Sequence, residues 1–112
     1  MKDQPIKRAV VTGARGFIGK ALVKYLWRAG TEVIAIDLKP GAESDYPSVV
    51  LDLKQPGVLD GFLDADTVIF HLAARADVAG SVRDPRKDFE ENLGGFFEVL
   101  EQARQRFWGQ WV

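Results

Sequence analysis

Three glycines are the residues whose spacing points most directly to chemistry. Gly13, Gly16 and Gly19 follow one another at intervals of three residues, between a short apolar run and an amphipathic segment. The first permits a tight turn after a strand, the second lets a phosphate approach the backbone, and the third allows close helix–strand packing. Amide groups and the positive dipole end at a helix start attract anions. The pattern therefore predicts a pyrophosphate site.

Asp37 supplies the second half of this signal, because it ends the next apolar run, 18 residues after Gly19. A carboxylate at this point accepts hydrogen bonds from an adenosine ribose and repels a 2′-phosphate. The glycines and Asp37 together predict dinucleotide binding, with NAD favoured over NADP. Arg15 is the residue that would instead select a 2′-phosphate, but we expect an exposed loop arginine. The alternative for the whole pattern is that the glycines serve turn geometry and Asp37 is a solvated strand end.

Apolar runs and helical patterns alternate along the chain, which predicts an α/β fold with a parallel sheet of four or five strands and helices on both faces. We expect strands at 8–12, 32–37, 48–51 and 67–72, helices at 17–29 and from Asp84 onward, and a weak, interrupted helix at 55–63. Each long helix has one apolar stripe, which we expect to be core: Phe17, Ile18, Ala21, Leu22, Tyr25, Leu26 and Ala29 in the first, and Phe89, Leu93, Phe96, Phe97, Leu100 and Ala103 in the last.

The tail at residues 105–112 (QRFWGQWV) fits this scheme less well. A fifth strand is expected there and would begin at Arg106, but Gly109 and Gln110 interrupt the apolar run. A sheet that stopped at this point would present an unpaired edge and exposed aromatic residues. Both features favour self-association, so the sequence allows a homodimer.

The composition excludes several classes of protein. The chain has 112 residues, 15 basic and 16 acidic side chains, a net charge of −1, one histidine and no cysteine. Disulfide scaffolds, transmembrane helices and strongly basic nucleic-acid or membrane binders are therefore disfavoured. We expect one soluble, cytoplasmic domain over residues 1–112. His71 alone cannot form a metal site, and we interpret it as structural rather than as a proton-transfer residue.

Residues 12–19 (TGARGFIG) resemble the TGxxGFIG motif of the extended short-chain dehydrogenases/reductases, the NAD-dependent epimerase/dehydratase family that acts on nucleotide sugars. Residues 49–53 (VVLDL), 71–74 (HLAA), 77–85 and 92–101 resemble later segments of that family. The resemblance implies a Rossmann-like fold, NAD as cofactor, and cofactor contacts in four places. They are Phe17 and Ile18 in the glycine motif, Asp52 and Leu53 near the adenine, Leu72, Ala73 and Ala74 along the cofactor's path, and Asn92 beside the site.

Some of these residues also have a plainer interpretation. Asp52 is equally well explained as a capped strand end, and Asn92 as a polar helix residue. Ala73 and Ala74 are small, which by itself lets the backbone approach a cofactor closely.

The chain departs from the family at its chemistry. Relatives use a Tyr-x-x-x-Lys pair, but Ala29 follows Tyr25 and Val50 follows Tyr46 at the lysine position. We therefore expect no catalytic residues and a fold truncated relative to the family. The chain would be the cofactor-binding part of an epimerase- or dehydratase-like oxidoreductase, inactive alone, and would meet a nucleotide sugar only with the rest of the enzyme. One alternative is a non-catalytic dinucleotide-sensing or regulatory module. Another, a methyltransferase-type nucleotide binder, is disfavoured by residues 12–19 and Asp37.

Overall fold

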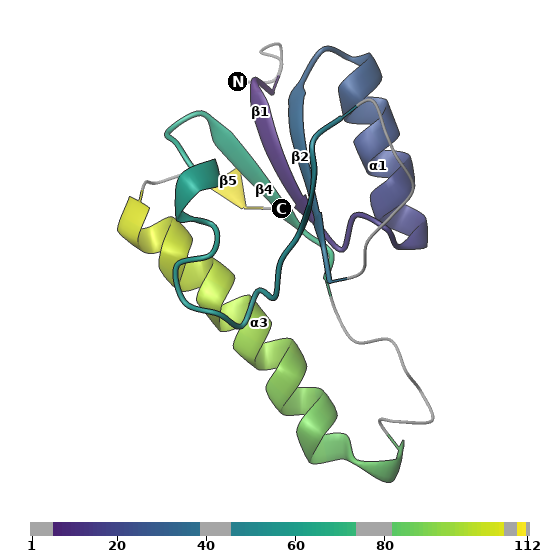
Figure 1. Cartoon of the computed structure of the whole chain (residues 1–112), viewed down its shortest axis with the longest axis vertical. Coiled ribbons are helices and arrows are strands. Elements are labelled where there is room, and N and C mark those ends of the chain that lie inside the picture. Colours follow the sequence, from purple (N-terminus) through teal and green to yellow (C-terminus); the bar gives the residue numbers. More distant parts are fainter. Residues whose placement is uncertain (1–5, 39–45, 74–81, 107–109, 112) are drawn as a thin grey trace.

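The protein folds around a five-stranded parallel sheet with the strand order β3-β2-β1-β4-β5. A computed structural model describes residues 6–38, 46–73, 82–106 and 110–111 (Figure 1). All four pairs of neighbouring strands are parallel, which confirms the predicted fold class. The strands are β1 (Arg8–Thr12), β2 (Glu32–Asp37), β3 (Ser48–Val50), β4 (Thr67–His71) and β5 (Gln110–Trp111).

The helices α1 (Phe17–Arg28) and α3 (Pro85–Arg106) lie on opposite sides of the sheet (Figure 1). Successive side chains of a strand point to opposite faces, so each strand contributes to two cores. In β1, Val10 packs on the α3 side with Val99, whereas Val11 packs on the α1 side with Val23. Strands that are apolar on both faces must be covered on both, and this explains the continuous apolar runs in the sequence.

Helix α1 ends as predicted, at a glycine in the left-handed region, because Gly30 has a φ of 89°. The predicted buried stripe of α1 is only partly correct. Leu26 is buried as predicted, but Phe17 is 94% exposed, and Ile18 and Tyr25 are also exposed. Val23, which the predicted stripe did not include, is fully buried. The prediction placed too many side chains in the core, because a helix packed on a sheet buries only the side chains that face the strands.

Helix α3 starts as predicted at an aspartate cap. The Lys87 amide donates to Asp84 Oδ1 at 3.1 Å, and Pro85 is the first helical residue. Its predicted core stripe is correct only at Ala103, which is buried, since Phe89, Phe96 and Phe97 are exposed by 63%, 42% and 57%.

The face of α3 that covers the sheet carries, besides Ala103, the unpredicted residues Gly95, Val99 and Gln102. The N-terminal half of α3 also extends beyond the sheet (Figure 1), where no strand lies beneath it. Its large apolar side chains therefore have no sheet surface to pack on.

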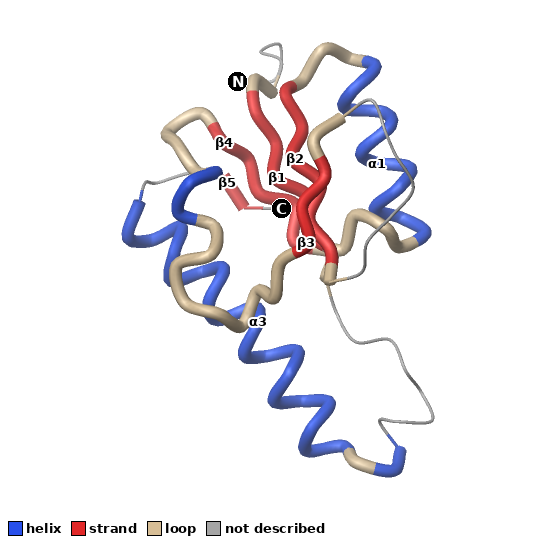
Figure 2. Tube along the Cα trace, in the orientation of Figure 1, coloured by secondary structure: helices blue, strands red, loops and turns tan. Residues whose placement is uncertain are grey.

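Four segments differ from their predicted form (Figure 2). Residues 55–63 form a single 3₁₀ turn, Asp60–Phe62, because Pro56 and the positive φ of Gly57 (78°) prevent a longer helix. The last strand is Gln110–Trp111 and pairs with Val68 and Ile69, so it includes Gln110, one of the two residues at which we expected the apolar run to break. Strands β3 and β4 each end one residue earlier than predicted. Among the described residues, no helix has the length and apolar character needed to cross a bilayer.

Candidate functional site

A pocket of about 730 Å³ lies at the carboxyl ends of β1, β2, β3 and β4. In open α/β sheets ligands bind where the strand order reverses, and here that point lies between β1 and β4. The volume falls in the range of small-molecule and cofactor sites. The pocket is lined by Gly13, Arg15, Gly16, Ile36, Asp37, Leu38, Leu51, Asp52, Leu53, Lys54, His71, Leu72, Ala73, Glu91, Asn92 and Gly95.

The glycine turn after β1 is packed tightly against the end of β4. Gly13 has a φ of 67°, and a Cβ on it would lie 2.7 Å from the Ala73 nitrogen. A Cβ on Gly19 would lie 2.2 Å from the Gly13 carbonyl oxygen. Both contacts are with backbone, which cannot rotate aside. Glycine is therefore required at Gly19 by packing, as predicted, and at Gly13 both by the positive φ of the predicted tight turn and by packing against Ala73.

The start of α1 is suited to an anion. Gly16 occupies the cap position and offers no capping side chain, and the first turn contains no acidic residue. The Lys20 amide donates to the Gly16 carbonyl at 2.9 Å. The amides that precede Lys20 in the helix are directed out of the helix end, as at every α-helix start. Together with the helix dipole they form a positive surface at the pocket wall.

Asp37 is held beside this turn. The Arg15 amide donates to Asp37 Oδ2 at 3.0 Å, and the Ala14 amide donates to the Ile36 carbonyl at 3.1 Å. The carboxylate is half-buried at the end of β2. These hydrogen bonds connect the glycine turn to β2, so the Asp37 carboxylate has a fixed position relative to the start of α1.

Thr12 joins β1 to the exit of β4. Its hydroxyl oxygen accepts from the Leu72 amide at 3.1 Å and from the Ala73 amide at 3.2 Å, and it lies 2.8 Å from His71 Nδ1. The His71 ring stacks on Phe96 of α3, with centroids 5.5 Å apart and planes 14° apart. Burial lowers the pKa of His71 below its ordinary value.

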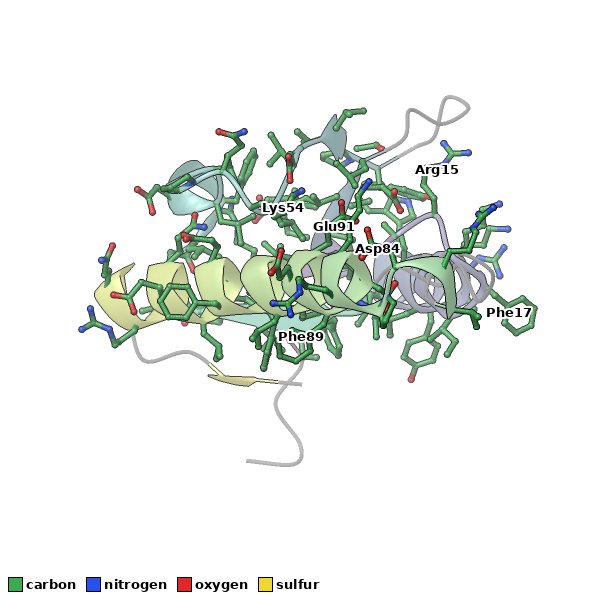
Figure 3. The ribbon with its side chains drawn as sticks, turned by 90° about the horizontal axis from the view of Figure 1, so that it is seen from below. Arg15, Phe17, Lys54, Asp84, Phe89 and Glu91 are labelled. Carbon is green, nitrogen blue, oxygen red and sulfur yellow. The ribbon has the colours of Figure 1, made fainter. Side chains whose placement is uncertain are left out.

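Two charged residues that were not predicted from the sequence lie at the α3 side of the pocket. Lys54 Nζ and Glu91 Oε1 lie 4.0 Å apart, and Figure 3 shows both on the side of α3 opposite Phe89. Their side chains are partly exposed, so the pair adds little stability. The sequence indicated these two residues only through their neighbours, since Lys54 follows the predicted site residue Leu53 and Glu91 precedes the predicted site residue Asn92. Asp52 Oδ1 also accepts from the Lys54 amide at 3.0 Å, so Asp52 caps this turn while lining the pocket.

The structure brings most, but not all, of the predicted site residues into the pocket. Phe17 and Ile18 point away from the pocket into solvent, as Figure 3 shows for Phe17. Gly19 lies beneath the turn as a packing residue, and Ala74 lies outside the described residues. Arg15 is half-buried rather than exposed, contrary to expectation. The residues that the structure brings together in the pocket are Gly13, Arg15, Gly16, Asp37, Asp52, Leu53, Leu72, Ala73 and Asn92.

The model of the NAD dependent epimerase/dehydratase family matches residues 9–110. The chain belongs to this family. It is 38% identical over 108 residues to the UDP-glucose 4-epimerase of Mycolicibacterium smegmatis, covering 87% of this chain and 34% of the relative. It is 33% identical over 107 residues to the D-erythronate dehydrogenase of Haemophilus influenzae, covering 88% of this chain and 34% of that enzyme.

A solved member of the family has the same fold. The UDP-glucose 4-epimerase of Thermus thermophilus, determined in complex with NAD, superposes with a TM-score of 0.75 at 36% identity. The match covers 88% of this chain and 34% of the epimerase. This epimerase/dehydratase family chain thus spans about a third of the length of the relatives that it matches.

Proposed function

We propose that this chain is the NAD-binding part of an epimerase- or dehydratase-like oxidoreductase of its family. The observation that carries the proposal is the pocket at the β1–β4 switch point, where the glycine turn, the start of α1 and Asp37 converge. NAD supplies a hydride acceptor when it is bound. The whole enzyme's substrate is left open, because relatives of similar identity include both a UDP-glucose 4-epimerase and a D-erythronate dehydrogenase.

The residues present fit a dinucleotide. Gly13, Gly16 and the first amides of α1 would hold the pyrophosphate, because Gly16 has no side chain to block the helix end. Gly13 could not be replaced at this turn, because a side chain there would collide with Ala73. Asp37 would accept hydrogen bonds from the adenosine ribose. Asp52, Leu53, Leu72, Ala73 and Asn92 would line the remaining length of the cofactor.

Asp37 gives the first test of this proposal. A carboxylate beside a 2′-phosphate is repelled by it, so we expect the chain to bind NAD more tightly than NADP. Asp37→Ala removes a charged hydrogen-bond acceptor and is expected to weaken NAD binding by about tenfold, with a smaller effect on NADP. Isothermal titration calorimetry of the purified chain with both cofactors measures the four affinities.

Asp66→Ala is the matched control, because Asp66 is an exposed aspartate outside the pocket lining. It should leave both affinities unchanged. Equal affinity of the unaltered chain for NAD and NADP, or an Asp37→Ala variant with undiminished NAD affinity, would remove the proposed role of Asp37. Tighter binding of S-adenosylmethionine than of NAD would favour the methyltransferase-type alternative instead.

We also propose that the chain does not turn over a nucleotide sugar by itself. Neither tyrosine is followed four residues later by a lysine, so the family's proton-transfer pair has no counterpart in the sequence. With saturating NAD and UDP-glucose, we expect no epimerised product from the purified chain above a protein-free blank. Product formation in proportion to protein concentration would contradict this expectation.

A further inference from the structure

The hydrogen bonds around Thr12 determine which nitrogen of His71 carries a proton. A threonine hydroxyl has one hydrogen to donate and two lone pairs with which to accept. Both lone pairs face amide donors: that of Ala73 at 3.2 Å, and that of Leu72 at 3.1 Å, which is shared with the Thr12 carbonyl oxygen at 3.2 Å. The hydroxyl hydrogen therefore points to His71 Nδ1, 2.8 Å away. Nδ1 is then an acceptor, and the neutral ring carries its hydrogen on Nε2.

We propose that His71 is a positioning residue of the cofactor pocket: its Nδ1 accepts the Thr12 hydroxyl hydrogen and thereby fixes the backbone of Leu72 and Ala73 at the pocket wall. The proposal goes beyond the cofactor contacts described above, and its link to binding rests on the proposed NAD site. It assigns to the only histidine of the chain a role that depends on its protonation state.

The surroundings of the ring leave this arrangement little freedom. Thr12 is fully buried, and the ring of Phe96 stacks on the imidazole from α3. Ala73 is also packed against the Gly13 turn, where a Cβ would come within 2.7 Å of its nitrogen. Displacement of Ala73 would therefore move the glycine turn as well. The hydroxyl of Thr12 thus connects the two strand ends that form the pocket.

Protonation of His71 would disrupt this connection. A hydrogen on Nδ1 would face an oxygen whose lone pairs already accept two amides, and the hydroxyl hydrogen would lose its acceptor. The charged side chains that share the pocket with the ring are Arg15 on the turn, Asp37 after β2, Asp52 and Lys54 after β3, and Glu91 on α3. Lys54 and Glu91 are paired with each other.

The direction of the pH effect follows from the buried position of the ring. Burial lowers the pKa of His71 in the folded chain, so the neutral form and its bond to Thr12 persist at and above the ordinary histidine pKa of about 6.5. As the pH falls below this value, the unfolded chain takes up a proton first and folding stability declines. As the pH falls further, through the folded-state pKa, the bond itself is lost.

The tautomer can be measured directly and without any ligand. The full chain labelled with ¹⁵N-histidine gives one pair of ring nitrogen signals, because His71 is its only histidine. At pH 7.5 we expect the Nε2–H form alone in the unaltered chain and in Thr12→Ser, which keeps the hydroxyl. Thr12→Val, which has a similar shape without the hydroxyl, should show a mixture of tautomers and faster hydrogen exchange at the Ala73 amide. An Nδ1–H form in the unaltered chain, or an unchanged tautomer in Thr12→Val, would overturn the proposal.

The link to binding is tested by NAD titrations from pH 8 to pH 5, with far-UV circular dichroism confirming the folded state at each pH. Affinity should fall by about tenfold for each pH unit below the His71 pKa. His71→Asn keeps an acceptor bonded to Cγ but does not titrate, so its affinity should not follow this fall. Asp66→Ala should keep the same pH profile as the unaltered chain.

The two possible failures can be told apart. An equal loss of affinity in His71→Asn would place the titrating group elsewhere and overturn the role of His71. Absence of NAD binding at every pH, with the expected tautomer intact, would refute the proposed function and, with it, the effect of His71 on binding. The hydrogen-bond connection itself would then stand on the tautomer and exchange data.

Discussion

Gly19→Ala is expected to destabilise the protein by on the order of 3 kcal/mol, which for a chain of this size lowers the melting temperature by roughly 10 °C or more. The added methyl carbon would lie 2.2 Å from the Gly13 carbonyl oxygen and 2.9 Å from the Ala14 Cα. Both atoms belong to the turn backbone, so relief requires α1 to move away from β1. Because that movement opens the pyrophosphate side of the pocket, NAD binding should be lost along with stability.

Gly94→Ala is the matched control, because Gly94 also lies inside a helix but has room for a side chain. Its nearest neighbour would be Lys54 Cγ at 3.9 Å, an ordinary contact. Alanine is favoured over glycine in a helix interior, so this variant should gain about 0.5–1 kcal/mol. Thermal and urea unfolding of both variants give the comparison. Equal and small effects of the two substitutions would mean that Gly19 is not held against the turn.

The strands and the glycine turn could be predicted from the sequence because each is encoded locally. Residues 8–12 and 32–37 are short, β-branched and free of interior charge, and both form strands with the predicted bounds. The turn between β1 and α1 needs glycine for steric reasons that act over a few residues. Gly30 at the end of α1 is a third example, since only its own φ is involved.

The buried faces of the helices could not be predicted in the same way, because burial depends on what lies opposite. Phe89 and Leu93 belong to a regular apolar stripe and are exposed, because the sheet does not extend beneath the first half of α3. The composition of that stripe carries no information about the position of the sheet edge. Lys54 and Glu91 illustrate the same limit, since they are 37 positions apart in the chain and only the tertiary fold brings them together at the pocket.

Gln102 is the residue that most clearly shows which face of α3 is buried. Its side chain is only 3% exposed, its Oε1 accepts from the Leu59 amide at 2.6 Å, and its Nε2 donates to the Glu98 carbonyl at 3.1 Å. Leu59 is itself fully buried. Gln102→Leu would leave the Leu59 amide without its acceptor inside the core, which is expected to cost about 2–3 kcal/mol of folding free energy.

Gln105→Leu makes the same chemical change three residues later on the same helix, but at an exposed position where the glutamine contacts Glu101. It should change the free energy of unfolding by less than about 0.5 kcal/mol, as measured by urea denaturation. The pair distinguishes the two possible orientations of α3. If the stripe of Phe89, Phe96 and Phe97 faced the sheet, Gln102 would be directed away from Leu59 and both substitutions would be nearly neutral. A large effect confined to Gln102 is what the observed orientation requires, because only in that orientation does the Gln102 side chain accept a hydrogen bond from the buried Leu59 amide.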